Sequence, residues 1–198
     1  MRTYKLIGLT GTTGSGKGEA RKVFERYGCS VIDADLLARE IMSNPVVLNS
    51  LQSFFGADVV EDGRLNRSLL AQRAFASKKK TNLLNSITHP HITTLFLSEL
   101  NSLAGGGAQT IVFDAPQLFE SKLDALCDCV VAVIAEEGVR AERIMKRDNL
   151  TREEAEARIK AQFSDEYFRE NSDYIIENNS TVGELKLNAE KIIEIIRR

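Results

Sequence analysis

The 198-residue sequence predicts an α/β fold in which a five-stranded parallel sheet is flanked by helices. Two observations lead to this prediction. Short apolar segments alternate with helical segments, and most are apolar on both faces, as strands of a parallel sheet covered on both sides must be. The first apolar segment also runs directly into a glycine-rich turn and a helix, which is a common strand–turn–helix unit.

Five segments carry the strand pattern, and helical stretches separate them. Parallel strands joined by right-handed crossovers are therefore the expected arrangement. A glycine run at 105–107, just before the third strand, predicts a loop. The expected strands are residues 4–9, 30–32, 110–113, 129–134 and 174–176.

The helical pattern predicts a single domain, 1–198, made of three parts. A core is expected at about 1–35, 104–138 and 173–198, ending in a helix over 182–198 that packs on the sheet. An insertion at about 36–103, with helices at 46–55, 67–76 and 91–103, is far longer than a crossover helix needs. A third part, about 139–172, is dense in Arg, Lys and Glu and predicts either a solvated helix pair or a lid whose arginines close over phosphates.

The composition excludes several partners. A net charge of -2 gives no basic field for nucleic acid, and no apolar run approaches the roughly 20 residues of a membrane span. The N-terminal apolar stretch belongs to the first strand and predicts no signal peptide.

Cys29, Cys127 and Cys129 fit no zinc spacing and predict free thiols in a reducing, cytoplasmic setting. The sequence predicts no oligomeric state.

The glycine-rich turn is the most informative motif. Gly11, Gly16 and Lys17 match the phosphate-binding pattern G-x-x-x-x-G-K-[ST] after an apolar strand and before a helix. Backbone N–H groups, the helix N-terminus and the lysine would all face one anion, so the motif predicts nucleoside triphosphate binding. The residues expected at the phosphates are Gly11, Thr12, Thr13, Gly14, Ser15, Gly16, Lys17 and Gly18.

The last position of this motif is Gly18, where Ser or Thr normally places a hydroxyl on Mg²⁺. No direct protein ligand for the metal is therefore assigned. Mg²⁺ would be held by ATP oxygens and waters, with Asp33 and Asp114 as candidate contributors, which suits an ion that usually keeps several waters.

Carboxylates follow two of the expected strands, where ligands bind in open α/β sheets. Asp33 is the expected general base for an attacking hydroxyl, although an Asp at this place can also cap a helix. Asp35 is then the candidate for the helix cap or for a ligand of metal-bound water. Asp114 is a candidate ligand of metal-bound water or of substrate. The pair His89-Pro90 predicts the first turn of a helix and, on its own, no chemistry.

Several short motifs occur in a fixed order along the chain. They are Gly8-Leu9-Thr10-Gly11 leading into the loop, Val31-Ile32-Asp33-Ala34-Asp35 with Ala38-Arg39, Leu65-Asn66-Arg67 with Leu70, His89-Pro90, Asp114-Ala115-Pro116-Gln117-Leu118-Phe119-Glu120, Arg147-Asp148 and Asn178-Asn179. Each motif alone is weak evidence, but the ordered combination is specific, and it resembles the dephospho-CoA kinase family.

The resemblance implies transfer of the ATP γ-phosphoryl group to the 3′-hydroxyl of dephospho-CoA, the last step of coenzyme A biosynthesis, by a P-loop kinase core with an acceptor-binding lobe and a lid. It implies catalytic roles for Asp33, Lys17 and Arg147. It places Arg143, Asn178 and Asn179 at ATP. The implied acceptor-binding residues are Asp35, Arg67, His89, Asp114, Pro116, Leu118, Phe119, Glu120 and Arg140.

The chain departs from the family pattern at Thr12, Thr13, Gln117 and Gly18, and Gly18 bears most directly on metal binding and rate. Two alternatives therefore stay open. One is a kinase of another nucleoside-like or nucleotide-like acceptor, because fold does not fix function. The other is a catalytically weakened protein that binds ATP or a CoA-like ligand.

Overall fold

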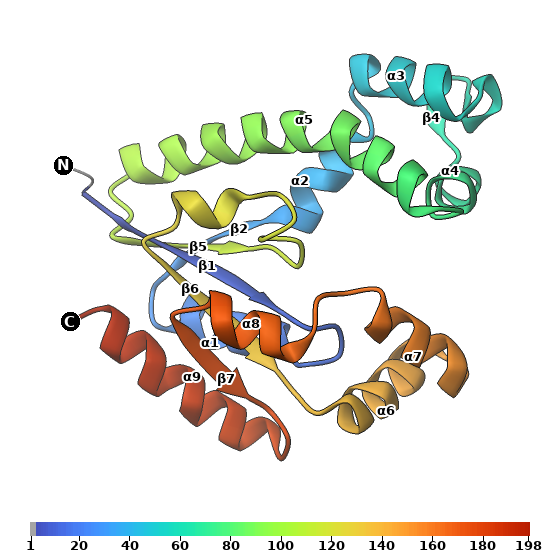
Figure 1. Ribbon diagram of the computed structural model, residues 1–198. Coiled ribbons are helices and arrows are strands. Elements are labelled where there is room, and N and C mark those ends of the chain that lie inside the picture. The colour runs from blue at the N-terminus through green and yellow to red at the C-terminus, as the bar shows by residue number, and fades with distance from the viewer. Residues whose placement is uncertain (1–2) are drawn as a thin grey trace. The chain divides into compact units, whose positions relative to one another are not determined.

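A computed structural model describes residues 3–198 of the protein (Figure 1). Five strands form one sheet in the order β2-β5-β1-β6-β7. The central strand β1 pairs in parallel with β5 and β6, and β6 pairs in parallel with β7, which confirms the predicted sheet. Most strands run one or two residues past their predicted ends. Their bounds are β1 Lys5–Gly11, β2 Ser30–Asp33, β5 Thr110–Asp114, β6 Cys129–Ile134 and β7 Tyr174–Glu177.

Both faces of the sheet are buried, which explains why its strands read as continuous apolar runs. Val131 and Val133 of β6 pack with α1 (Lys17–Arg26) and α9 (Val182–Ile196), which lie side by side in Figure 1. Ala132 and Ile134, on the other face of the same strand, pack against Phe168 of α8 (Asp165–Asn171). Alternate residues of one strand thus serve two separate apolar layers.

The chain divides into two compact units: residues up to Ile32 with Ser102–Arg198, and Asp33–Asn101. The second unit has its own apolar core, which includes Val47, Leu51 and Leu70. Its elements are α2 Ala34–Ile41, α3 Pro45–Phe55, the 3₁₀ turn Ala57–Val59, β3 Val60–Glu61, β4 Arg64–Leu65, α4 Arg67–Ala74 and most of α5 Lys78–Gly105.

The sequence analysis missed the small hairpin of β3 and β4. Asp62 and Gly63 join the two strands, and both have positive φ angles, 49° and 73°. Two successive positive φ angles make a type I′ turn, the turn that favours Asp-Gly in two-residue hairpins. The Asp-Gly pair was therefore a signal for a hairpin in the sequence. Strands of two residues are too short to show the alternation of apolar and polar residues that marks a strand.

The helix predicted at 91–103, with Pro90 in its first turn, exists, but its predicted first residue is wrong. The helix α5 runs from Lys78 to Gly105, with Pro90 inside it. Proline lacks the N–H that would bond the carbonyl four residues earlier, so an interior proline is normally a helix breaker. Here Leu84 and Thr88 before it, and Phe96 and Leu100 after it, are all buried, and their packing holds the helix together across this point.

The charged stretch expected as a helical lid forms three helices: α6 Glu137–Asp148, α7 Arg152–Lys160 and α8. Helix α6 ends at Asn149, in the left-handed region with φ 54°, and Thr151 begins α7 with a capping box completed by Glu154. Ala141 and Ile144 of α6 pack against Ala155 and Ile159 of α7. Within residues 3–198, none of the helices combines the length and apolar character needed to cross a bilayer.

Candidate active site

The phosphate-binding loop between β1 and α1 is held from outside by contacts to its carbonyl groups. Asn178, which is 4% exposed, donates from Nδ2 to the Ser15 carbonyl at 2.7 Å. Arg143 of α6 donates from Nη1 to the Gly14 carbonyl at 3.4 Å. In a trans peptide the C=O and N–H groups point in opposite directions. The N–H of Gly16 therefore faces away from Asn178, into the loop, where a phosphate oxygen would accept it.

Two glycines make this packing possible. Gly14 and Gly16 have φ angles of 78° and 94°, which L-residues rarely adopt. A Cβ atom at Gly14 would lie 2.9 Å from the Arg140 carbonyl oxygen of α6, and one at Gly16 would lie 2.5 Å from Nδ2 of Asn178. The glycines thus allow both the loop conformation and the close approach of α6 and Asn178.

Lys17, the lysine of the motif, pairs with Asp114 at the end of β5. The other carboxylate oxygen of Asp114 accepts from Nη1 of Arg21 at 3.3 Å. Asp114 is 5% exposed, so it needs such cationic partners. The sequence analysis missed Arg21, although residues four apart in a helix share a face, and Lys17 and Arg21 have this spacing. Arg21 also pairs with Glu25 at 3.5 Å, so the two cations face two carboxylates and Arg21 bridges them.

The hydroxyls of the loop belong to Thr12, Thr13 and Ser15, and none of them stands at the position of Gly18. Thr12 and Ser15 are 2% and 0% exposed, and their hydroxyl oxygens have no hydrogen-bond partner among the described residues. Within the same residues, no group of three or more His, Cys, Asp or Glu side chains could hold a metal ion. A metal held directly by several protein ligands therefore does not fit this site.

The three arginines of helix α6 have different surroundings. Arg140 is 3% exposed and donates to the Ala135 carbonyl at 2.7 Å and to Asp165 at 3.1 Å, so it fastens α6 to the start of α8. Arg143 is half-buried against the phosphate-binding loop. Arg147 is exposed and donates to Asp148 from Nε at 2.8 Å and from Nη2 at 2.9 Å. Of the three, Arg143 makes the direct contact with the loop.

Asp148 also accepts from Arg158 of α7 at 2.6 Å, and these hydrogen bonds, that of Arg147 foremost, lower its pKa to about 2. We expect an NMR titration of this carboxyl to show that midpoint, and Arg147→Ala to raise it more than Arg158→Ala does. Because the pKa is lowered on folding, the pairs stabilise the fold above the ordinary carboxyl pKa of about 3.9, and this contribution is lost as the pH falls towards 2. A midpoint near the ordinary value would mean that the pairs do not persist in solution.

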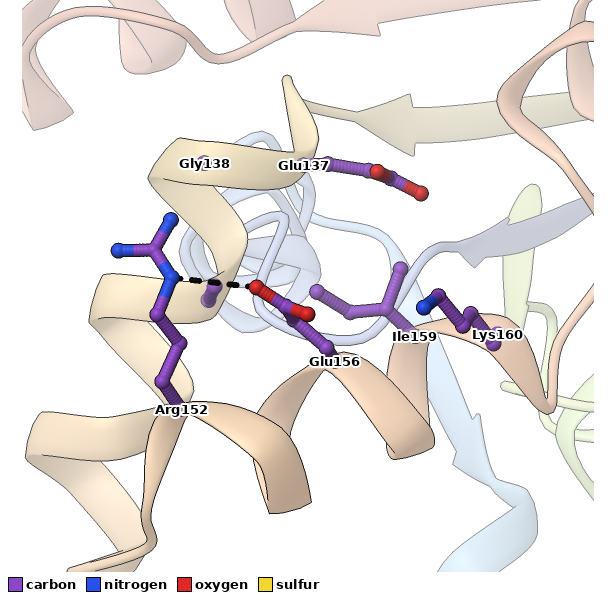
Figure 2. Close-up of a pocket in the computed structure, with 7 residues that line it drawn as sticks. Glu137, Gly138, Arg152, Glu156, Ile159 and Lys160 are labelled. Atoms are coloured by element: carbon purple, nitrogen blue, oxygen red, sulfur yellow. Dashed lines mark hydrogen bonds and ion pairs between the residues drawn. The ribbon is translucent and has the colours of Figure 1, made fainter.

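A cavity of about 200 Å³ lies between α6 and α7 (Figure 2). Figure 2 shows Arg152 and Glu156 paired on one side, at 3.1 Å, with Glu137 and Lys160 also lining the space. Its charged lining is balanced, two cations against two carboxylates, so it offers no net attraction for a phosphate. We assign it no role in the reaction.

The segment after β5 that the resemblance assigns to the acceptor is largely engaged in packing. Leu118 is fully buried, and its side chain fills the space that a larger residue at Gly8 would need. Phe119 meets Tyr167 of α8 edge to face, with ring centroids 5.5 Å apart. The Pro116 carbonyl accepts from the Thr10 hydroxyl at 3.4 Å. Gln117 and Glu120 are exposed, and partial desolvation raises the pKa of Glu120.

In the second unit, Asp33 begins helix α2. Its Oδ1 accepts from the backbone N–H of Asp35 at 2.9 Å and of Leu36 at 3.2 Å. The sequence analysis left Asp35 with the cap or a metal-water role. The cap is Asp33, because the chain turns into the helix directly after it, and the metal-water role of Asp35 stays a prediction. Both capping bonds are accepted by the same carboxylate oxygen, Oδ1 of Asp33.

Two of the motifs quoted for the resemblance meet in one cavity of the second unit. It has a volume of about 470 Å³ and includes Asp35 and Arg39 from α2 and Arg67 from α4. Phe75, which is 65% exposed, lines it as well and was missed by the sequence analysis. His89 lies in α5, half-buried, and is not part of this lining. The cavity has an apolar floor and charged residues of both signs.

A family model described as dephospho-CoA kinase matches residues 5–184. The chain belongs to the dephospho-CoA kinase family. It is 35% identical to a dephospho-CoA kinase of Listeria innocua, over 96% of each chain. It is 40% identical to a dephospho-CoA kinase of Corynebacterium diphtheriae, over 89% of this chain and 90% of that one.

Solved structures agree with this fold. The Thermus thermophilus protein TT1252 superposes with a TM-score of 0.86 at 30% identity, covering 98% of both chains. Dephospho-CoA kinase from Campylobacter jejuni superposes with a TM-score of 0.72 at 24% identity, covering 96% of both chains. Shikimate kinase from Acinetobacter baumannii has a TM-score of 0.58 at 17% identity, which supports the same class of fold alone.

Proposed function

We propose that the protein transfers the terminal phosphoryl group of ATP to the 3′-hydroxyl of dephospho-CoA, giving CoA and ADP, as the last step of coenzyme A biosynthesis. The family match over residues 5–184 carries this proposal. The loop with its inward Gly16 N–H, and the cations beside it, support the part that concerns ATP.

On the donor side, phosphoryl transfer needs positioning and charge neutralisation more than covalent help. Lys17 would leave Asp114 for the β- and γ-phosphates, while Arg21 keeps the Asp114 carboxylate paired. Arg143 would carry its charge to the same phosphates, with Arg147 nearer the transferred group. We propose that Asn178 serves ATP through the loop backbone, and we keep Asn179 as a candidate beside the adenine.

On the acceptor side, Asp33 would take the proton of the 3′-hydroxyl as its oxygen bonds to the phosphorus and the bond to the ADP oxygen breaks. The acceptor itself would use the 470 Å³ cavity, with Arg67 and Asp35 at its polar groups. His89 and the segment Asp114 to Glu120 complete the proposed acceptor-binding set. Bound Mg²⁺ would supply charge neutralisation through ATP oxygens and waters.

We also propose a cytoplasmic location, with ATP and dephospho-CoA as the partners. The support is chemical: the three cysteines are free, and Cys29 and Cys129 are buried thiols, as a reducing compartment allows.

The experiment that tests this function measures ADP release from Mg-ATP with and without dephospho-CoA, and identifies the product by mass. Acceptor-dependent turnover with the mass gain of one phosphate on dephospho-CoA is the expected result. A preference for a nucleoside in a panel of hydroxyl acceptors would overturn it. Tight binding of both ligands without turnover would favour the weakened homologue.

Gly18→Ser is expected to keep or raise activity. Gly18 is exposed in the first turn of α1, and a Cβ atom there meets nothing within 4 Å, so the serine side chain fits without strain. Its hydroxyl would restore the missing partner of the metal, and the turnover rate should then saturate at a lower Mg²⁺ concentration. Gly138→Ser, at an exposed glycine of α6 that is equally open, is the matched control. A collapse of activity in Gly18→Ser alone would mean that the loop is built around the absent side chain.

A further inference from the structure

One N–H of the phosphate-binding loop is bonded by a side chain from a distant part of the same unit. The backbone N–H of Thr13 donates to Oε1 of Gln162 at 2.7 Å. Gln162 is half-buried and lies between α7 and α8, 149 residues further along the chain. Neither the sequence analysis nor the proposed mechanism gives this residue a role.

The other bonded N–H groups of the loop have backbone partners. Thr12 donates to the Val133 carbonyl of β6 at 3.1 Å, and Ser15 donates to the Thr12 carbonyl at 3.1 Å. These two bonds build the turn itself and cannot be given up without refolding it. The bond from Thr13 is different, because a side chain can rotate away and leave the loop unchanged.

The position of Thr13 indicates which phosphate would compete for its N–H. Gly16 caps helix α1 and Lys17 is its first residue, so a phosphate at this helix N-terminus would lie nearest to these two residues. Thr13 lies three residues before Gly16, on the opposite limb of the loop, so the next phosphate along the nucleotide would reach it. A phosphate oxygen is a stronger acceptor than a neutral carboxamide, since charge-assisted hydrogen bonds are about twice as strong as neutral ones.

We infer that Gln162 is a positioning residue that distinguishes a nucleoside triphosphate from a diphosphate. Its side-chain carbonyl accepts the hydrogen bond of the Thr13 N–H and keeps that N–H oriented. When a nucleoside triphosphate binds, an oxygen of the terminal phosphate replaces Gln162 as the acceptor. The side chain of Gln162 then rotates away, and the loop itself keeps its conformation. This inference rests on the proposed use of ATP.

The test compares the affinities of ADP and of a non-hydrolysable ATP analogue by calorimetric titration without any acceptor. Gln162→Glu replaces the carboxamide by a carboxylate. The carboxylate accepts a stronger hydrogen bond from the Thr13 N–H and repels the negative charge of a terminal phosphate. We expect the Kd of the analogue to rise by about tenfold or more, as the loss of one charge-assisted hydrogen bond would give, while the Kd of ADP changes by less than about threefold. Gln109→Glu, in the exposed loop before β5, controls for the added charge.

A second variant covers the case in which the glutamate disturbs folding. Gln162→Met keeps the length of the side chain and removes its polar atoms. It should leave the Kd of ADP unchanged and keep or lower that of the analogue. In the wild-type protein, the Thr13 amide resonance should shift on binding the analogue and much less on binding ADP.

The outcomes separate the two claims. Equal weakening of both nucleotides by Gln162→Glu, or no weakening of either, overturns the role of Gln162 and leaves the proposed function standing. Wild-type protein that binds neither nucleotide overturns the proposed function and this inference together.

Discussion

Lys17→Met is expected to lower kcat/KM for ATP by on the order of a thousandfold, the largest effect of any single change in the donor site. Removing one fixed charge or donor that acts on the transition state typically costs about 10²- to 10³-fold, and Lys17 would serve two phosphates. The fold should survive, because Asp114 keeps Arg21 as its partner at 3.3 Å. Steady-state kinetics together with thermal unfolding measure both parts of this prediction.

The matched control for this change is Lys22→Met. Lys22 is an exposed lysine of the same helix, and its ammonium pairs with Glu19 at 2.6 Å. An exposed pair of this kind contributes little to stability, so kcat/KM and the melting temperature should stay close to wild type. If Lys17→Met kept more than about a tenth of wild-type kcat/KM, the pair of Lys17 and Asp114 would be structural and the donor mechanism would need another cation.

The sequence predicted the sheet and the phosphate-binding loop well because their signals are local. Apolar strands, the glycine spacing and Lys17 all lie within a few residues of one another, and the β1–α1 unit folds as one piece of chain. The cap at Asp33 and the interior position of Pro90 were misjudged for a related reason. Each depends on where a helix starts, which a pattern fixes only to within a few residues.

The hydrogen bonds that hold the loop could not be predicted from the sequence, although two of the residues that make them, Arg143 and Asn178, were placed at ATP by the resemblance. Asn178 and Gln162 reach the loop across 163 and 149 residues of chain, and no motif in the sequence marks Gln162. Only the folded sheet brings β7 and the segment after α7 back to β1. Asn178 was predicted near ATP from the resemblance, and its hydrogen bond to Ser15 suggests a physical reason for that position.

Asp33→Asn is expected to lower kcat by about 10²- to 10⁴-fold, the range that general base catalysis usually contributes. Asparagine keeps the cap, because its Oδ1 can accept from the same two backbone N–H groups that Asp33 binds at 2.9 and 3.2 Å. It cannot accept the proton of the attacking hydroxyl. Activity should therefore fall while the KM for ATP and the melting temperature stay near wild type.

Asp33→Ala separates the two roles of this residue. Alanine loses the base and the cap together, so it should match Asp33→Asn in activity and add a loss of stability of about 1 kcal/mol, the usual cost of removing a helix cap. Single-turnover measurements at saturating ATP and dephospho-CoA report the chemical step itself. A kcat within about threefold of wild type in Asp33→Asn would show that Asp33 only begins helix α2, since a base that contributes less than half a decade is not needed for the transfer.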